Sequence, residues 1–216
     1  MLLMALFTFF LAVLASRMAI LSFIIILVYF IVNQLQKKKW IPNILALGCI
    51  LIAFGGMIWL NPVTRFRVIQ EPRATGLKIH HQVTQWNSVN LRLLEWQASW
   101  DIIKKSWFAG VGTGDGQDAL KSYYASFNAS TMDMDYNSHN QYLQTIIELG
   151  VMGLISLLLC FFLPAFRQDY SILYFSFILL FSLLCLTECM LARQKGIIFF
   201  TLFQSLFLNG GSATPR

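Results

Sequence analysis

Long apolar stretches constrain this chain more than any other feature. The stretches lie at residues 1–15, 18–35, 41–60, 142–166, 170–186 and 196–208. Most of them approach or exceed the length that an α-helix needs to cross a bilayer, while the first and the last are short. A chain inside hydrocarbon must satisfy its own backbone polar groups, which helices do. We therefore expect an all-α protein, a polytopic bundle of about six transmembrane helices.

Composition supports a membrane protein and limits its partners. Hydrophobic residues make up 57% of the chain and charged residues 12%, with a mean hydropathy of +0.62. The formal net charge is +6, but most basic residues stand in loops or beside apolar stretches. Phospholipid headgroups and anionic lipid-linked substrates fit this distribution, and nucleic acid does not.

A dense cluster of lysines sets the expected orientation. Lys37, Lys38 and Lys39 lie between two apolar stretches, which places that loop in the cytoplasm by the positive-inside rule. Counting spans from there predicts three parts: membrane spans in 1–60, a large extracytoplasmic loop in 61–138, and membrane spans in 139–216. All three histidines then fall on the outer face of the membrane, as do Arg17 and Arg92.

The extracytoplasmic loop contains an amphipathic pattern. Apolar residues recur at helical spacing and form one narrow stripe: Val89, Leu93, Trp96, Trp100, Ile103 and Trp107. This pattern predicts a helix that lies along the membrane surface or over the transmembrane bundle, with its tryptophans at headgroup level. Arg92 flanks the stripe, either as a functional guanidinium or as an arginine that snorkels to the interface.

Three polar features of the loop have plain interpretations. The alternating glycines of residues 110–116 lack the flanking elements and the Gly-Lys-Ser/Thr ending of phosphate loops, so they are expected to end the helix and turn the chain. His80 and His81 have no evident third ligand. Asp133 and Asp135 have the spacing of a carboxylate pair that can hold a divalent metal, but their polar surroundings favour a solvated loop. No metal site and no cofactor are therefore expected.

His139 stands where a polar loop enters an apolar stretch. An imidazole with an ordinary pKa near 6.5 exchanges protons at physiological pH and could meet a lipid-borne substrate there. Along the following helix, Gln141, Gln144 and Glu148 form a polar strip. An acid at that depth indicates either a functional site or an internal pair within the bundle. The glycines at 150 and 153 are explained by close helix packing.

Several of these motifs together resemble a known family. The sequence WFAGVGTG at residues 107–114, and His139-Asn140 followed by Gly150 and Gly153, are similar to the O-antigen ligase and polymerase superfamily of bacterial envelope glycosyltransferases. Further similarity lies in Ser16-Arg17, in Leu91-Arg92 with its tryptophans, and in Thr187-Glu188. The similarity extends along the whole chain and corresponds to the C-terminal half of the family's pattern.

The resemblance implies a metal-independent membrane enzyme with a GT-C-like fold. It would sit in the bacterial inner membrane and transfer a glycan from undecaprenyl diphosphate to lipid A-core or another glycan acceptor at the periplasmic face. Arg17 and Arg92 would bind the diphosphate, because a guanidinium can contact two phosphate oxygens. His139 would act as general base. Asn140 or Tyr142 would steady the imidazole or the acceptor, and Glu148 would contribute to substrate binding.

Both enzymatic and non-enzymatic alternatives remain open. A polymerase, whose acceptor is another lipid-linked repeat unit, or a protein-glycosylating relative would use the same residues. Because the match is to the C-terminal half of the family, a truncated membrane remnant that binds lipid-linked glycan without turnover is a non-enzymatic alternative. A transporter is disfavoured, since the ionisable residues gather at one face of the membrane.

Overall fold

The computed structural model describes residues 17–35, 48, 51–52, 55–56, 59–66, 88–125, 136–166 and 172–210. Every regular element in those ranges is helical, which confirms the all-α class for them. The chain forms two compact units, Met1–Gly76 and Leu77–Arg216. The predicted division at residues 60 and 138 stays a prediction.

The first unit contributes an apolar helix and a short capped one. Helix α2 spans Arg17–Leu35 and presents an exposed apolar stripe that includes Leu21, Ile24 and Val28. Helix α4 spans Pro62–Arg65 and begins at Asn61, whose Oδ1 accepts hydrogen bonds from the backbone N–H groups of Val63 and Thr64. This is the usual N-cap arrangement, in which a side-chain oxygen satisfies the first free N–H groups of a helix.

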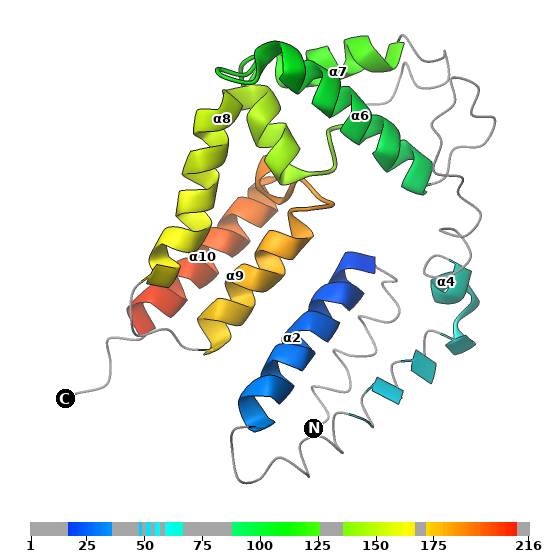
Figure 1. Cartoon of the computed structure of the whole chain (residues 1–216), viewed down its shortest axis with the longest axis vertical. Coiled ribbons are helices and arrows are strands. Elements are labelled where there is room, and N and C mark those ends of the chain that lie inside the picture. Colours follow the sequence, from blue (N-terminus) through cyan, green and yellow to red (C-terminus); the bar gives the residue numbers. More distant parts are fainter. Residues whose placement is uncertain are drawn as a thin grey trace. The chain divides into compact units, whose positions relative to one another are not determined.

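The second unit contains the remaining elements and the candidate site. They are α6 (Ser88–Ser106), α7 (Gly116–Ala125), α8 (Gln141–Phe162), η3 (Leu163–Phe166), α9 (Ile172–Leu184), η4 (Met190–Ala192) and α10 (Gln194–Gly210). Within this unit, α8, α9 and α10 run side by side, and α6 and α7 pack at the N-terminal end of α8 (Figure 1).

One described helix is long and apolar enough to cross a membrane, namely α8 at Gln141–Phe162. Shorter apolar helices occupy Met18–Tyr29, Leu173–Leu184 and Gln194–Leu208. The predicted total of about six spans is therefore not established by these residues and stays a prediction.

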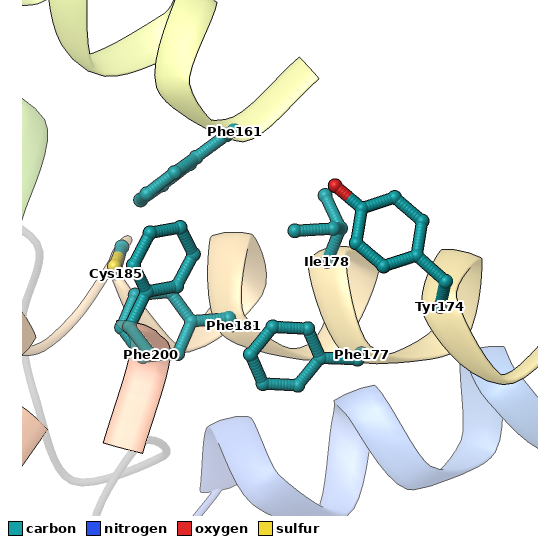
Figure 2. Close-up of a cluster of buried hydrophobic side chains, with 7 residues drawn as sticks. All are labelled: Phe161, Tyr174, Phe177, Ile178, Phe181, Cys185 and Phe200. Atoms are coloured by element: carbon teal, nitrogen blue, oxygen red, sulfur yellow. The ribbon is translucent and has the colours of Figure 1, made fainter. Parts of the chain in front are cut away.

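An aromatic cluster holds α8, α9 and α10 together. Figure 2 shows this cluster, whose buried members are Phe161, Tyr174, Phe177, Ile178, Phe181, Cys185 and Phe200. The rings of Phe181 and Phe200 have centroids 4.7 Å apart, and Phe161 meets Phe181 edge-on at 5.7 Å. Tilted and edge-on contacts of this kind stabilise aromatic pairs beyond the area that they bury.

A second apolar cluster joins α6 and α7 to the start of α8. Its buried members are Leu94, Ala98, Ile103, Leu120, Tyr124 and Ile147. The face of α6 that is buried also carries Glu95 and Ser99. Trp100 and Trp107 of the predicted stripe are 55% and 58% exposed. The predicted helix is thus confirmed, but it packs through a face with small residues, which allow closer approach than tryptophans do.

Helix α8 is broken at Gly150, where φ is +67° and ψ is −164°. The loop after α6 hydrogen-bonds to the backbone on both sides of this break. Val111 N–H donates to Ile147 O at 2.7 Å, Gly112 N–H donates to Glu148 O at 3.0 Å, and Val151 N–H donates to Trp107 O at 2.9 Å. The loop therefore satisfies polar groups that the interrupted helix leaves unpaired.

The glycines of this junction do more than the sequence interpretation assigned to them. Gly110 and Gly112 turn the chain after α6 with φ of +72° and +103°, as expected, and Gly110 N–H donates to the carbonyl of Ser106, the last residue of that helix. Gly150 was explained by close helix packing, but its role is to break the helix: its conformation is open essentially to glycine alone. A Cβ there would stand 2.0 Å from Phe108 O.

Replacing Gly150 by alanine should destabilise the fold. The added Cβ would meet the Phe108 carbonyl, and the backbone conformation would be strained, which together predict a loss of at least about 2 kcal/mol in the free energy of unfolding. Gly114→Ala is the matched control, since nothing lies within 4 Å of its Cβ position. Unfolding of the detergent-solubilised variants measures the difference, and equal stabilities would contradict the assigned role.

Candidate functional site

The candidate site forms where the loop of residues 136–140 enters α8. His139 has φ of +41°, a conformation uncommon for residues other than glycine, although histidine is among those that adopt it more often. Its backbone N–H donates to Asn137 Oδ1 at 2.9 Å. Strained backbone of this kind concentrates at functional sites, where surrounding contacts hold it in place.

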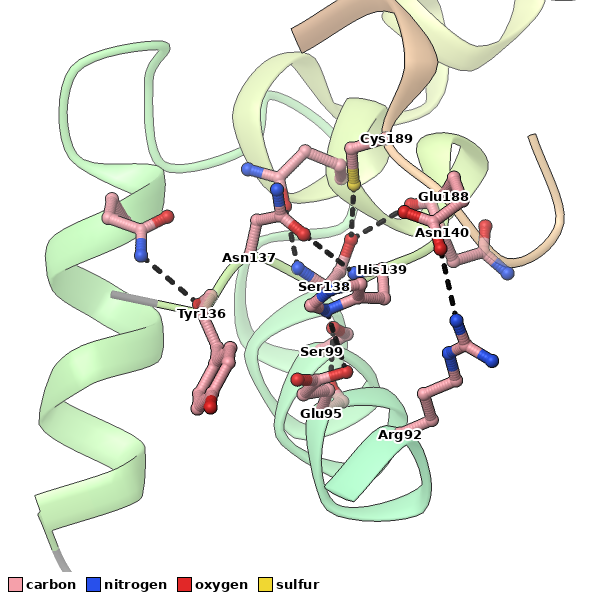
Figure 3. A network of polar contacts seen from close by, with 12 residues as sticks. Arg92, Glu95, Ser99, Tyr136, Asn137, Ser138, His139, Asn140, Glu188 and Cys189 are labelled. Carbon is pink, nitrogen blue, oxygen red and sulfur yellow. Dashed lines mark hydrogen bonds and ion pairs between the residues drawn. The ribbon is translucent and has the colours of Figure 1, made fainter. Parts of the chain in front are cut away.

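A buried carboxylate contacts the imidazole of His139. Nδ1 of His139 lies 3.0 Å from Oε2 of Glu95, which reaches across from α6 (Figure 3). The Glu95 side chain has no exposed surface, and that of His139 is 23% exposed. Removing a carboxylate from water is costly unless a partner compensates, so the imidazole is important for keeping Glu95 inside the fold.

The pair changes the proton affinity of both groups. Contact with Glu95 raises the pKa of His139 above its usual 6.5, although burial opposes this, and the charge of Glu188 adds to the increase. Burial raises the pKa of Glu95, and this outweighs the lowering effect of His139 and Arg92. When His139 is neutral, a proton on Nδ1 facing Glu95 leaves the lone pair on Nε2.

Arg92 lies one helical turn before Glu95 and pairs with Glu188. Its Nη2 is 3.0 Å from Glu188 Oε1, and the two side chains are 30% and 41% exposed. Arg92 lowers the pKa of His139, whereas Glu188 raises it, so both charges act on the imidazole. The structure thus brings together the four groups Arg92, Glu95, His139 and Glu188.

The loop that carries Glu188 is fastened to the start of α8. Gln141 N–H donates to Cys185 O at 2.8 Å, and Gln141 Oε1 accepts from Leu191 N–H at 2.8 Å. Between these two points, Cys189 Sγ lies 3.5 Å from Ser138 Oγ. Gln141, the first residue of the polar strip predicted on α8, therefore holds the loop of Glu188 on both sides of that residue.

Glu148, predicted to bind substrate, has an internal partner. Gln144 Nε2 donates to Glu148 Oε1 at 2.6 Å, and Gln144 Oε1 accepts from Ser138 N–H at 3.1 Å. This is the internal pairing that the sequence allowed as an alternative to a functional role. Gln144 thereby links the acid to the loop that carries His139.

Asn140 and Tyr142 also have partners within the fold. Asn140 is the N-cap of α8, and its Oδ1 accepts from the N–H groups of Tyr142 and Leu143 at 3.0 and 3.1 Å. The Tyr142 hydroxyl donates to Ser182 O on α9 at 2.9 Å. These contacts fix the entry of the loop into α8, and with it the position of His139.

Other predicted residues lie in the first unit or outside the described ranges. Arg17 is the first residue of α2, and its side chain is not among those described. His80 and His81 lie outside the described residues, as do Asp133 and Asp135. The described residues contain no group of three or more His, Cys, Asp or Glu that could hold a metal ion.

Glu95 is the functional candidate that the sequence interpretation missed. The apolar stripe drew attention to a neighbouring side of the helix, on which Trp100 is exposed. A signal was present, because Glu95 lies beside Leu94, Ala98 and Ser99 on a face of small and apolar residues. An acid on such a face needs a partner from another element, but its identity depends on the packing of α6 against α8.

The described residues define a class of protein: a helical fold, with one helix long and apolar enough to cross a membrane, that places a carboxylate-supported imidazole beside a guanidinium. A family model described as O-antigen ligase matches residues 2–158. The chain belongs to this O-antigen ligase family, as the resemblance in its motifs predicted. No curated protein and no solved structure matches the chain.

Replacing Glu95 by glutamine should lower the pKa of His139. The contact that raises the pKa is lost while the burial that lowers it remains, so His139 should titrate below 6.5 instead of above it. The raised pKa of His139 means that its protonation stabilises the native protein fully below pH 6.5, and that this contribution is lost as the pH rises through the folded-state pKa.

The three histidines make this measurement practicable by NMR with isotope-labelled histidine. His139→Asn identifies the signal of His139 by its loss. The same titration midpoint in the wild type and in Glu95→Gln would show that Glu95 does not control the imidazole.

Proposed function

We propose that this chain is a membrane glycosyltransferase that transfers a glycan from undecaprenyl diphosphate to an acceptor such as lipid A-core. The observation that carries the proposal is the imidazole of His139, held by buried Glu95 and close to the guanidinium of Arg92. Transfer of a glycan from a diphosphate to a hydroxyl needs a group that accepts a proton and a group that binds phosphate. Membership of the O-antigen ligase family supports such a transfer.

In the proposed reaction, His139 is the general base. The acceptor hydroxyl attacks the anomeric carbon, its proton passes to Nε2 of His139, and the bond from that carbon to the diphosphate oxygen breaks. Glu95 supports this step by holding the proton of Nδ1 and stabilising the imidazolium that forms. A base whose pKa lies close to the operating pH is the most effective, so a pKa raised from 6.5 toward that pH suits the role.

Arg92, together with Arg17, is proposed to bind the diphosphate. Negative charge grows on the leaving group as the glycosidic bond breaks, and a fixed guanidinium stabilises it most in a site shielded from water. Arg92 is partly buried and carries a full positive charge. Arg17 is assigned on its sequence motif alone.

Asn140, Tyr142 and Glu148 are proposed to contact substrate with atoms that the fold does not already use. The helix cap uses Oδ1 of Asn140, so contact with an acceptor hydroxyl would come from Nδ2. Gln144 engages Oε1 of Glu148, which directs any substrate contact to the second carboxylate oxygen.

We propose that the exposed aromatic edge formed by Trp107 and Phe108, directly after α6, lies at the headgroup level of the periplasmic leaflet. Trp107 packs edge-on against Phe108, and both side chains are exposed. The Trp107 carbonyl accepts a hydrogen bond from Val151 of α8, the helix long enough to span a membrane. Tryptophan prefers the bilayer interface, so this edge supports a site at the membrane surface of a multi-pass inner-membrane protein.

Replacing His139 by asparagine should reduce glycan transfer by at least about 100-fold, the contribution typical of a general base. Asparagine tolerates positive φ, so the loop should retain its conformation. Transfer is measured in liposomes that contain the chain, undecaprenyl diphosphate-linked glycan and lipid A-core. His80→Asn is the matched control and should transfer at the wild-type rate.

The wild-type rate in His139→Asn would remove the base assignment. The product distinguishes the acceptors: glycan on lipid A-core indicates a ligase, and lengthened lipid-linked glycan indicates a polymerase. No product from the wild-type chain would favour a non-catalytic membrane protein.

A further inference from the structure

The Arg92–Glu188 pair has features of an exchangeable contact. One guanidinium nitrogen, Nη2, meets one carboxylate oxygen at 3.0 Å, and both side chains are partly exposed. The Glu95–His139 pair is different, because its carboxylate has no exposed surface. Partly exposed ion pairs contribute little to stability, so a multiply charged anion can displace the carboxylate.

The attachment of the Glu188 loop allows the side chain to move without the loop. Contacts at Cys185, Cys189 and Leu191 fasten the loop to the start of α8. Gly196 allows α10 to pack closely against the end of this loop, since a Cβ at Gly196 would stand 1.9 Å from Met190 O. With its backbone held on both sides, Glu188 presents its carboxylate to Arg92 through rotatable side-chain bonds.

A carboxylate and a phosphate compete for the same donors. Both present oxygen atoms that accept charge-assisted hydrogen bonds from a guanidinium, and a diphosphate carries more charge than a carboxylate. Exchange of one anion for the other would keep Arg92 neutralised at every stage. The positive charge beside His139 would then be balanced both before and after the donor binds.

We propose that Glu188 occupies the position of a donor phosphate oxygen on Arg92 and is displaced when a diphosphate binds. The proposal rests on the proposed function in assigning the diphosphate to Arg92, and adds an internal competitor to that site. Glu188 thereby lowers the apparent affinity for every diphosphate. It also keeps Arg92 away from weaker anions, which cannot displace the carboxylate.

Binding of farnesyl diphosphate, a short prenyl diphosphate, tests the exchange. The full chain is purified in detergent, and the dissociation constant is measured by isothermal titration calorimetry. Glu188→Gln should bind the probe about fivefold more tightly, since a partly exposed ion pair contributes up to about 1 kcal/mol and about 1.4 kcal/mol corresponds to tenfold. Glu188→Asp, whose shorter side chain withdraws the carboxylate from Arg92, should also bind more tightly.

Two further variants separate the possible results. Asp118→Asn removes one negative charge from the exposed surface of α7 and should bind like the wild type. Arg92→Ala should lose most of the binding. If Arg92→Ala weakens binding while both Glu188 variants bind no more tightly than the wild type, the exchange is wrong and the diphosphate site stands. If Arg92→Ala binds the probe as tightly as the wild type does, both the exchange and the diphosphate site on Arg92 are wrong.

Discussion

The contact between the buried carboxylate of Glu95 and the imidazole of His139 is the interaction on which the site depends. An acid without exposed surface is tolerated only where a partner offsets its lost hydration. That partner stands on a loop with φ of +41°, a conformation that the surrounding contacts must hold. Helix α6, the loop and the first turns of α8 therefore form a single packed unit.

Close packing of α6 against α8 makes this contact feasible. Ala98 and Ser99 are fully buried on the face of α6 that carries Glu95, so no large side chain separates the two helices there. The loop after α6 then inserts at the break of α8 and pairs with its free backbone groups. The glycine motif after α6 thus packs against α8, the helix that begins directly after the histidine motif, although the two motifs lie far apart in the sequence.

Much of the fold could be predicted because it follows from local chemistry. Apolar length predicted α8 and α9 to within a few residues, helical spacing predicted α6, and glycines marked its end. The break at Gly150 could not be predicted, because it depends on the loop after α6, which packs against Gly150 and hydrogen-bonds to α8 on both sides of it. The packed face of α6 was missed for a similar reason: the tryptophan stripe is stronger in the sequence, but small residues allow the closer contact.

The site could be predicted only in part. His139 and Arg92 stood out as ionisable groups beside apolar stretches, and the structure brings them close to each other. Their partners Glu95 and Glu188 depend on tertiary packing, which residue spacing does not encode. Asn140 and Tyr142 were assigned through the family resemblance around His139, and the structure gives each of them a hydrogen bond within the fold.

A double-mutant cycle between Glu95 and His139 tests the central claim most directly. The free energy of unfolding would be measured at one pH for the wild type, Glu95→Gln, His139→Asn and the double variant. A buried, interacting pair predicts a coupling free energy above about 1 kcal/mol, because either single change leaves the other group without its charged partner. Additive effects, within about 0.5 kcal/mol, would contradict the claim that the two side chains depend on each other.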